Sequence, residues 1–361
     1  MSLSVSPSSS LLRVAVIGYG NAGATFHAPL IASTAGMQVA AIVTGNPERQ
    51  QVARQHFPDA LIYTQVQELW DHASEYDLAV IATPNQSHYP LGLAALEAGL
   101  PVIIDKPLAG TIAEAEQLLA KSQATGKMLT VFQNRRWDGD FLTIKRLIQQ
   151  KTLDSITRFE SRFERYRAQP RPNAWRESAD PSAAGGLLYD IGSHLIDQAL
   201  QLFGQPVSVY AEMDQRRPQA QIDDDSFVAL RFANGVRAHL WMSLVARRPG
   251  PRFRLIGLRG TYEKWGLDPQ ENALKAGQRP GHTNWGQEPR ELWGTLLCDQ
   301  GLTFDGQIET LPGSYEDYYA HIHSTLKNGA PPPVDPADAI AVLRIIEAAQ
   351  RSARNQTIVM L

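Results

Sequence analysis

Near its start the chain reads Arg13-Val14-Ala15-Val16-Ile17-Gly18-Tyr19-Gly20-Asn21-Ala22-Gly23. A short apolar run is followed at once by glycines in the spacing G-x-G-x-x-G, and a helical pattern then continues to residue 35. Gly18 permits a tight turn, Gly20 lets the backbone approach a pyrophosphate, and Gly23 allows close packing of helix on strand. The free N–H groups of a helix N-terminus attract phosphates. In this strand–turn–helix context the spacing predicts a dinucleotide-binding unit, rather than a turn that merely requires glycine.

The first third of the chain repeats this alternation of apolar runs and helical patterns. We expect strands over residues 13–17, 37–43, 78–82, 102–104 and 128–132, and helices over 22–35, 47–57, 88–98 and 112–125. Strands built from continuous Val, Ile and Leu and separated by helices are typical of a parallel sheet that is covered on both faces. The pattern therefore predicts an α/β fold of the doubly wound, Rossmann type.

The pattern changes after Trp137, where polar and apolar residues begin to alternate. Such alternation is typical of an antiparallel sheet with one buried face. We expect strands from residue 155 and over 207–211, 226–232, 236–244, 253–256 and 357–360, and helices over 139–150, 186–203, 314–327 and 336–354. The chain is thus expected to comprise a disordered leader (1–11), a dinucleotide-binding Rossmann domain (12–137) and an α+β domain (138–361).

The composition of the 361 residues, 43% hydrophobic and 20% charged, is that of a globular protein and excludes wholesale disorder. A net charge of −3 does not indicate binding to nucleic acid. The chain also lacks a basic amphipathic stretch of the kind that binds a membrane surface. The single cysteine, Cys298, excludes an internal disulfide and a cysteine-rich metal site. Residues 1–10 lack the basic and apolar regions of a signal peptide, and no apolar run is long enough to span a bilayer, so we expect a cytoplasmic protein.

The end of the second expected strand carries Thr44-Gly45-Asn46, with Arg49 one helical turn further on. An NAD site usually has Asp or Glu here, which accepts hydrogen bonds from the ribose hydroxyls. A carboxylate would repel the 2′-phosphate of NADP, whereas a hydroxyl, a glycine amide and a guanidinium would receive it. The sequence therefore favours NADP as the cofactor, with NAD as the second option; a solvated helix residue is the alternative for Arg49.

Lys106 follows the expected strand 102–104, at the carboxyl edge where open α/β sheets bind ligands. Pro107 restricts the backbone of this lysine to an extended conformation. A lysine held there could stabilise negative charge that develops on a substrate oxygen. A surface lysine at a strand end is the alternative.

Asp190 and His194 lie four apart in an expected helix and so share one face, with Asp197 near the same stripe. A histidine beside a carboxylate is suited to act as a general base, because the carboxylate orients the ring and stabilises its protonated form. An ion pair or a helix cap is the alternative. We expect no metal site, because no further histidine accompanies these three residues.

Four motifs occur in order along the chain. They are Gly18-Tyr19-Gly20-Asn21-Ala22-Gly23, Thr83-Pro84-Asn85-Gln86-Ser87-His88, Asp105-Lys106-Pro107-Leu108, and Gly185-Gly186 followed by Asp190, Gly192, His194 and Asp197. In these motifs the sequence resembles the glucose–fructose oxidoreductase/inositol dehydrogenase family (Gfo/Idh/MocA) over nearly its whole length. The resemblance implies an N-terminal Rossmann domain and a C-terminal α+β domain for substrate binding and oligomerisation. The largely antiparallel open sheet of the second domain is then expected to form the interface of a homodimer or homotetramer.

The resemblance also implies which residues act. It assigns catalysis to Lys106, Asp190 and His194, although the family usually has Glu where this chain has Asp105. With the turn and strand-end residues described above, the residues expected to contact the cofactor are Gly18, Tyr19, Gly20, Asn21, Ala22, Gly23, Thr44, Asn46, Arg49, Thr83, Pro84, Asn85, His88, Asp105, Lys106, Asn134, Trp175 and Arg176.

Within the family, residues 105–107, 132–138 and 315–319 are similar to the NADP-dependent scyllo-inositol dehydrogenase branch. This similarity implies reversible hydride transfer between nicotinamide and a ring carbon of a cyclic polyol or sugar. His194 would take the hydroxyl proton, Lys106 would polarise the oxygen, and Asp190 would hold His194 or a neighbouring hydroxyl. Two alternatives stay open: another sugar dehydrogenase or ketone reductase of the family, and a non-catalytic dinucleotide-sensing regulator. Retention of all three residues argues against the regulator.

Overall fold

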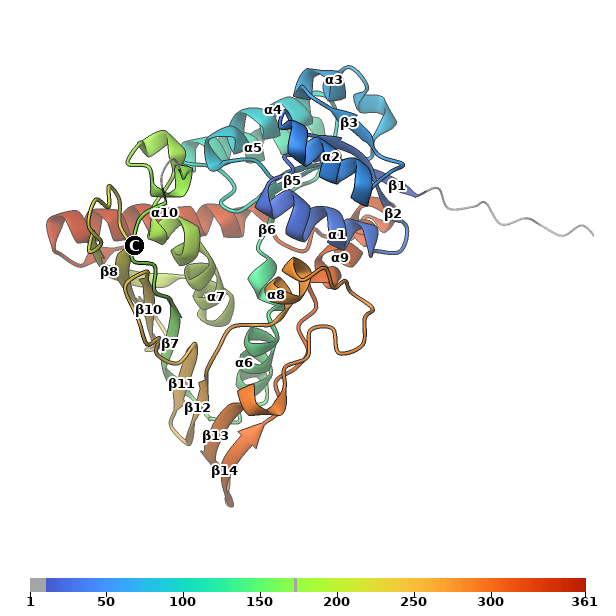
Figure 1. The fold of residues 1–361 in the computed structure, drawn as a ribbon. Coiled ribbons are helices and arrows are strands. Elements are labelled where there is room, and N and C mark those ends of the chain that lie inside the picture. The colour runs from blue at the N-terminus through green and yellow to red at the C-terminus, as the bar shows by residue number, and fades with distance from the viewer. Residues whose placement is uncertain (1–10, 172–173) are drawn as a thin grey trace, which may run out of the picture.

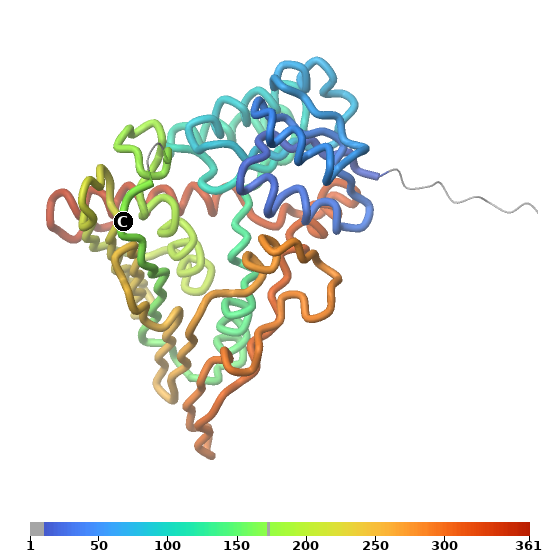
Figure 2. The backbone as a smooth tube through the Cα atoms, in the orientation of Figure 1, coloured from blue at the N-terminus to red at the C-terminus, as the bar shows by residue number. Residues whose placement is uncertain are grey.

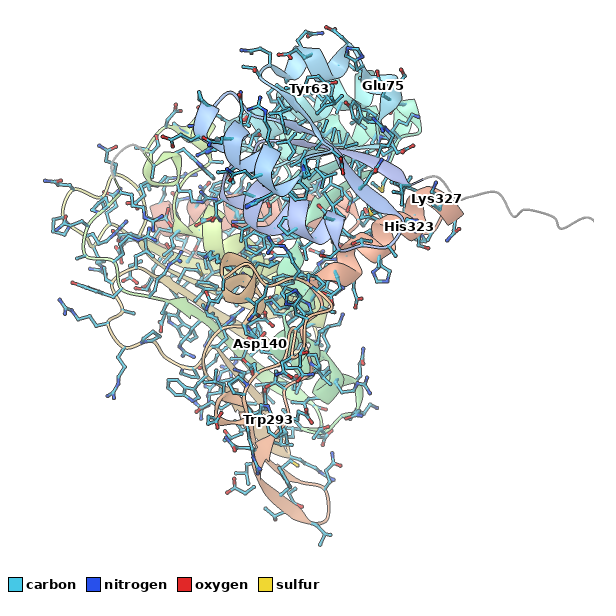
Figure 3. All side chains as sticks on the ribbon, turned by 45° about the vertical axis from the view of Figure 1, so that its right-hand side comes forward. Tyr63, Glu75, Asp140, Trp293, His323 and Lys327 are labelled. Atoms are coloured by element: carbon cyan, nitrogen blue, oxygen red, sulfur yellow. The ribbon has the colours of Figure 1, made fainter. Side chains whose placement is uncertain are left out.

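The computed structural model describes residues 11–171 and 174–361, which form two units built on separate sheets (Figure 1). The leader expected over residues 1–11 lies, apart from Leu11, outside the described residues. The two units lie along the long axis of the molecule. In Figure 3 that axis runs from the first unit, where Tyr63 is labelled, to the far end of the second, near Trp293.

The first unit is built on a parallel sheet with the strand order β3-β2-β1-β4-β5-β6. Its strands are β1 (Leu12–Ile17), β2 (Met37–Val43), β3 (Leu61–Tyr63), β4 (Leu78–Ile81), β5 (Val102–Asp105) and β6 (Leu129–Phe132). The chain order reverses between β1 and β4, and open α/β sheets bind ligands outside the carboxyl ends of the strands at such a reversal. The predicted doubly wound α/β fold is confirmed.

Two of the longer helices of this unit begin at residues whose side chains cap the helix start. Helix α2 (Pro47–His56) begins after Asn46, whose side chain accepts the N–H of Arg49. Helix α5 (Ile112–Thr125) begins with a capping box at Thr111. The other helices are α1 (Ala28–Ala32), α3 (Val66–Trp70) and α4 (His88–Glu97).

The helix expected over residues 22–35 is shorter than predicted and begins differently. A π-helical turn (Gly23–His27) leads into α1, which ends at Ala32 because the next two residues turn their hydroxyls onto preceding carbonyls. The sequence pattern also does not predict β3 or α3, because elements of three and five residues are too short to show a period.

The second unit is built on a nine-stranded sheet with the order β14-β13-β12-β11-β7-β10-β9-β8-β15. In these strands β7 and β10 pair in parallel, and the other neighbours run antiparallel. The strands are β7 (Ile156–Glu164), β8 (Pro206–Asp214), β9 (Asp225–Phe232), β10 (Arg237–Ser243), β11 (Phe253–Gly257), β12 (Gly260–Lys264), β13 (Gly294–Asp299), β14 (Thr303–Ile308) and β15 (Val359–Met360).

Helices cover one face of this sheet and leave the other open (Figure 1). The covering helices are α6 (Gly139–Gln149), α7 (Ser193–Phe203) and α10 (Pro336–Asn355), and the short α8 (Gln270–Lys275) lies between the units. Burial alternates along β9 and β10, as expected for a sheet with one buried face. The largely antiparallel open sheet is therefore confirmed. Strands β12 to β14 are not predicted, because each has only five or six residues, and glycine and charged residues interrupt the alternation of polar and apolar positions.

The end of the chain joins the two units. Helix α9 (Tyr315–Asn328) buries Tyr315, Tyr318 and Tyr319 in the hydrophobic core of the first unit. Helix α10 contributes Leu343 to that core and Ile346 to the core of the second unit. Figure 2 shows this red C-terminal segment passing beneath the first unit and along the second. A domain boundary at residues 137–138 stays a prediction, because α9 returns to the first unit.

Candidate active site

The glycine-rich turn follows β1 and gives each glycine a separate use. Gly18 has a φ of +95°, and a Cβ there would lie 2.6 Å from the carbonyl oxygen of Ala82. A Cβ on Gly23 would lie 2.0 Å from the oxygen of Gly18, so helix and strand approach too closely for a side chain. A Cβ on Gly20 would contact only the end of the flexible Arg49 side chain, with Nη1 at an ordinary van der Waals distance of 3.6 Å. A pyrophosphate can therefore approach the backbone at Gly20.

A cavity of about 550 Å³ lies over this turn, at the carboxyl ends of β1, β2 and β4. At the end of β2 its lining carries the hydroxyl of Thr44 and the guanidinium of Arg49, with no carboxylate among the described residues there. Most of the residues expected to contact the cofactor line it: Gly18, Tyr19, Gly20, Asn21, Ala22, Thr44, Arg49, Thr83, Pro84, Asn85, Asp105, Trp175 and Arg176. The open backbone at the turn, the hydroxyl and the guanidinium fit a dinucleotide. We refer to this space as the cofactor cavity.

Three residues expected to contact the cofactor support the site instead of lining the cavity. Gly23 packs against the strand, and Asn46 uses its side-chain oxygen to cap α2. His88 is fully buried, with Nδ1 2.7 Å from the carbonyl oxygen of Pro107 and Nε2 2.9 Å from that of Thr83. A ring enclosed in this way joins the loops after β4 and β5 and cannot touch a bound molecule, which corrects the expectation of direct contact.

A second cavity, of about 490 Å³, adjoins the first and contains the residues expected to be catalytic. Lys106 reaches it from the loop after β5, Asp190 from a π-helical turn (Leu188–Gly192), and His194 from the first turn of α7. Asn134 also lines this cavity. The two cavities share the lining residues Asn21, Ala22, Asp105 and Arg176. A cofactor in the first cavity would therefore meet a substrate in the second, which we call the substrate cavity.

The central contact of the substrate cavity joins the two units. Lys106 Nζ lies 2.9 Å from Asp190 Oδ1 and also donates to the backbone oxygen of Asp190. Arg176 Nε lies 3.1 Å from the same carboxylate oxygen. Burial by itself would raise the pKa of Asp190, but the two cations outweigh it and hold the pKa well below its usual value. Asp190 is therefore an anion that fixes Lys106.

His194 is buried at the base of the substrate cavity, and its Nδ1 has no hydrogen-bond partner among the described residues. Burial, and then the charges of Lys106 and Arg135, lower the pKa of this histidine well below 6.5. The ring is therefore uncharged at neutral pH and can accept a proton. The expectation that Asp190 orients His194 is corrected, because the carboxylate bonds to Lys106 and Arg176 and not, within the described residues, to the ring.

Asp197 lies behind the site and has a structural partner. Its carboxylate accepts hydrogen bonds from Arg136 Nε at 2.9 Å and Nη2 at 2.6 Å, and Arg136 also contacts Asp338 at 3.0 Å. This network ties α7 to the end of β6 and to α10. Asp197 therefore forms a structural ion pair, which is the alternative that the sequence left open for this pattern.

Sequence reasoning missed the basic wall of the substrate cavity. Arg165 and Arg167 line the cavity just after β7, and Arg171 follows in the next loop. The sequence does contain a pattern that could have indicated this wall. Arg165 and Arg167 are two residues apart, and in an extended chain such a spacing places both side chains on the same face.

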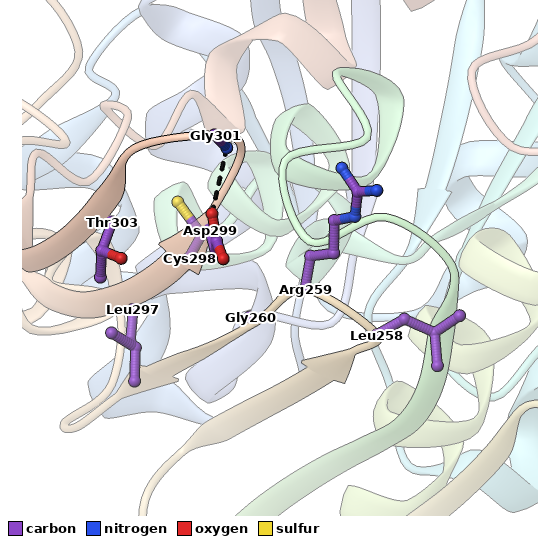
Figure 4. A pocket seen from close by; sticks show the side chains of 8 residues that line it. All are labelled: Leu258, Arg259, Gly260, Leu297, Cys298, Asp299, Gly301 and Thr303. Atoms are coloured by element: carbon purple, nitrogen blue, oxygen red, sulfur yellow. Dashed lines mark hydrogen bonds between the residues drawn. The ribbon is translucent and has the colours of Figure 1, made fainter.

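Another cavity, of about 640 Å³, lies at the edge of the nine-stranded sheet, beside the turns that join β11 to β12 and β13 to β14 (Figure 4). Its lining includes Leu258, Cys298 and Asp299 and none of the residues expected to act. Asp299 accepts a hydrogen bond from the backbone of Gly301. In residues 11–171 and 174–361 no group of three or more His, Cys, Asp or Glu is placed to hold a metal ion. No helix in the same ranges is both long and apolar enough to cross a membrane.

Two family models together match almost the whole chain. One, described as an oxidoreductase family with an NAD-binding Rossmann fold, matches residues 12–133. The other, the C-terminal alpha/beta domain of the same oxidoreductase family, matches residues 145–361. Both carry the family name Gfo/Idh/MocA, which is the resemblance stated from the motifs.

The chain is also similar to individual proteins along its full length. It is 40% identical to the oxidoreductase YdgJ of Escherichia coli, covering 96% of this chain and 97% of that one. It is 36% identical to the scyllo-inositol 2-dehydrogenase (NADP(+)) IolW of Bacillus subtilis, covering 97% of this chain and 96% of the relative. Among solved structures, the oxidoreductase yvaA of Bacillus subtilis superposes with a TM-score of 0.93 at 34% identity, covering 99% of this chain and all of that one.

Proposed function

The chain belongs to the Gfo/Idh/MocA family of oxidoreductases, and from this membership we propose that it transfers hydride between NADP(H) and a ring carbon of a cyclic polyol or sugar. It is an NAD(P)-dependent dehydrogenase by family and by its similarity to a dehydrogenase. The candidate pair is scyllo-inositol and scyllo-inosose, because a relative that matches over the whole chain is a scyllo-inositol dehydrogenase. The observation that carries the proposal is the ion pair between Lys106 and Asp190 beside an uncharged His194.

Three side chains divide the work at the reacting carbon. A bound nicotinamide would supply the hydride chemistry at the carbinol carbon. His194 takes the hydroxyl proton during oxidation and returns it during reduction, because burial leaves the ring uncharged. Lys106 donates a hydrogen bond to the same oxygen and stabilises its developing negative charge. Asp190 holds the ammonium of Lys106 in place.

The preference for NADP rests on the end of β2. Thr44 and Arg49 line the cofactor cavity there, and among the described residues no carboxylate at the end of β2 belongs to its lining. The exposed guanidinium of Arg49 lies beside Gly20, so it can receive a phosphate next to the turn. The relative IolW, named as NADP(+)-dependent, supports the same preference.

The test is a set of initial rates with scyllo-, myo- and chiro-inositol and with common hexoses, each with NADP and with NAD. We expect turnover of a cyclic polyol, with kcat/KM at least about tenfold higher for NADP than for NAD, which corresponds to about 1.4 kcal/mol. Turnover of other sugars alone would assign a different dehydrogenase of the family. No turnover of any compound with either cofactor would overturn the proposal.

A substitution near the end of β2 tests whether Arg49 is responsible for the preference for NADP. Arg49→Gln should raise the KM for NADP and leave the KM for NAD nearly unchanged, because NAD has no 2′-phosphate. The control is Arg54→Gln, an exposed residue on the same helix that does not belong to the lining of the cofactor cavity. Equal effects of Arg49→Gln on both cofactors would assign Arg49 to the phosphates that the two share.

We infer that copies of the chain associate through the open face of the nine-stranded sheet into a homodimer or homotetramer. On that face Phe227, Trp241 and His239 pack against one another and are only half-buried within the chain. Light scattering on the purified protein tests this association. A monomer at micromolar concentration would contradict it.

A further inference from the structure

The basic wall of the substrate cavity has no part in the hydride transfer proposed above. It consists of Arg165, Arg167 and Arg171, which follow β7 and line the same cavity as Lys106 and His194. The mechanism needs a proton acceptor and one hydrogen-bond donor at the reacting oxygen, and a neutral polyol needs no further charge. Three more guanidinium groups therefore require an explanation.

Each of the other cations of the cavity forms an ion pair with a carboxylate. Lys106 and Arg176 share Asp190. Arg135 and Lys275 share Glu271, at 2.8 Å and 2.5 Å, and Arg135 also pairs with Asp138 at 3.4 Å. These pairs fix the four side chains in place and reduce the charge that they offer to an anion.

The wall is different, because two of its three guanidinium groups have no carboxylate partner among the described residues. Arg167 has one, Glu177 at 3.5 Å, which also contacts Arg217 at 2.9 Å; Arg217 in turn pairs with Asp224 at 2.8 Å. Arg165 rests against the ring of Phe163, at 5.6 Å, and in the described part of the chain neither Arg165 nor Arg171 forms an ion pair. Burial, followed by the charges of the other two arginines, lowers the pKa of Arg167, as expected where like charges gather.

The balance of charge in the cavity points the same way. The described residues that line it include seven cationic side chains and three carboxylates, an excess of four positive charges, although the whole chain has a net charge of −3. Clefts lined by one sign of charge concentrate ligands of the opposite sign. Guanidinium groups match the geometry of carboxylates and phosphates, which they bind through two parallel hydrogen bonds.

We propose that the substrate carries an anionic group, a carboxylate or a phosphate, that Arg165 and Arg167 bind while Lys106 and His194 hold the reacting carbinol. This inference rests on the proposed function, because it names the class of polyol or sugar that the same cavity takes. It goes beyond the neutral inositol suggested by the relative, and it makes the basic wall the part of the site that selects the substrate.

The test compares neutral compounds with anionic partners of the same ring. The protein, loaded with NADPH, is titrated calorimetrically with glucose, glucuronate and glucose 6-phosphate, and with myo-inositol and its 1-phosphate. Initial rates are measured for the same compounds. We expect at least one anion to bind at least tenfold more tightly than its neutral partner. A preference for glucuronate would identify a carboxylate, and a preference for the phosphates would identify a phosphate ester.

Variants of the wall show whether the arginines are responsible. The double substitution Arg165→Gln/Arg167→Gln should remove the preference for the anion, mainly through KM, while the neutral partner and NADPH bind within about threefold of the unchanged protein. The charge-matched control is Arg54→Gln/Arg248→Gln, two exposed residues outside the cavity lining. Weaker NADPH binding in the wall variant would assign these arginines to the cofactor and overturn the inference.

The outcomes separate the inference from the function on which it rests. If neutral polyols turn over and no anion binds better than its neutral partner, the inference is wrong and the proposed function stands. If an anion binds through the wall but no compound turns over with either cofactor, the anion site is real and the proposed hydride transfer fails.

Discussion

Burial sets the charge of the histidines around the site. His27, His88 and His194 are all buried, and burial is the main cause that lowers the pKa of each below 6.5. An uncharged His194 can accept a proton at neutral pH without first losing one. The same desolvation also makes the folded protein sensitive to acid.

His27 allows this sensitivity to be measured at a single residue. It is fully buried, its Nδ1 lies 2.6 Å from the hydroxyl of Tyr319, and burial lowers its pKa to about 4. Between about pH 6.5 and pH 4 the unfolded chain therefore binds a proton at His27 that the folded chain does not bind. Folding stability is then lost as the pH falls, by about 1.4 kcal/mol per pH unit.

His27→Gln should remove this contribution, so the free energy of unfolding of the variant falls less steeply between pH 6.5 and pH 4. Urea denaturation at pH 7, 6 and 5 measures the slope. His72→Gln is the control, because His72 is exposed and pairs with Glu75 at the surface. An unchanged slope in His27→Gln would show that His27 is already charged in the folded protein.

Two glycines of the glycine-rich turn have different roles: Gly20 serves cofactor binding, and Gly23 serves the packing of helix on strand. Gly20→Ala adds a Cβ that contacts only the end of the Arg49 side chain without a clash, so the fold should keep its stability while NADPH binds at least about tenfold more weakly. Gly23→Ala forces a Cβ against the oxygen of Gly18 and should destabilise the protein by about 1–3 kcal/mol. Thermal unfolding and NADPH titration of both variants check this. Weak binding without loss of stability in Gly23→Ala would contradict the assignment.

At the scale of elements, the sequence predicts the helices and strands that have a clear hydrophobic period or a capping residue at their start. The long buried strands and α5, with its capping box, are found where expected. The π-helical turns over Gly23–His27 and Leu188–Gly192 are not predicted, because the apolar pattern is the same as that of an α-helix. The second turn matters most, since it presents Asp190 to Lys106 from the other unit.

At the scale of the molecule, the site depends on how the two units pack. Lys106 comes from the first sheet and Asp190 from the second unit, and α9 and α10 bury residues that hold the two units together. Motifs in the sequence name the residues on each side. They do not give the contacts between units, so the partners of Asp190 and the arginines that share its cavity emerge only from the folded chain.

The central claim is that Lys106 acts on the substrate in a cavity that adjoins the cofactor. The most direct measurement is the rate of Lys106→Met with the best substrate of the panel, together with its dissociation constant for NADPH. The control is Lys121→Met, a lysine on α5 that pairs with Glu97 away from both cavities. We predict a loss of kcat of about 10²–10⁴-fold or more, with NADPH binding within about threefold of the unchanged protein. Turnover that survives in Lys106→Met at the level of Lys121→Met would contradict the account.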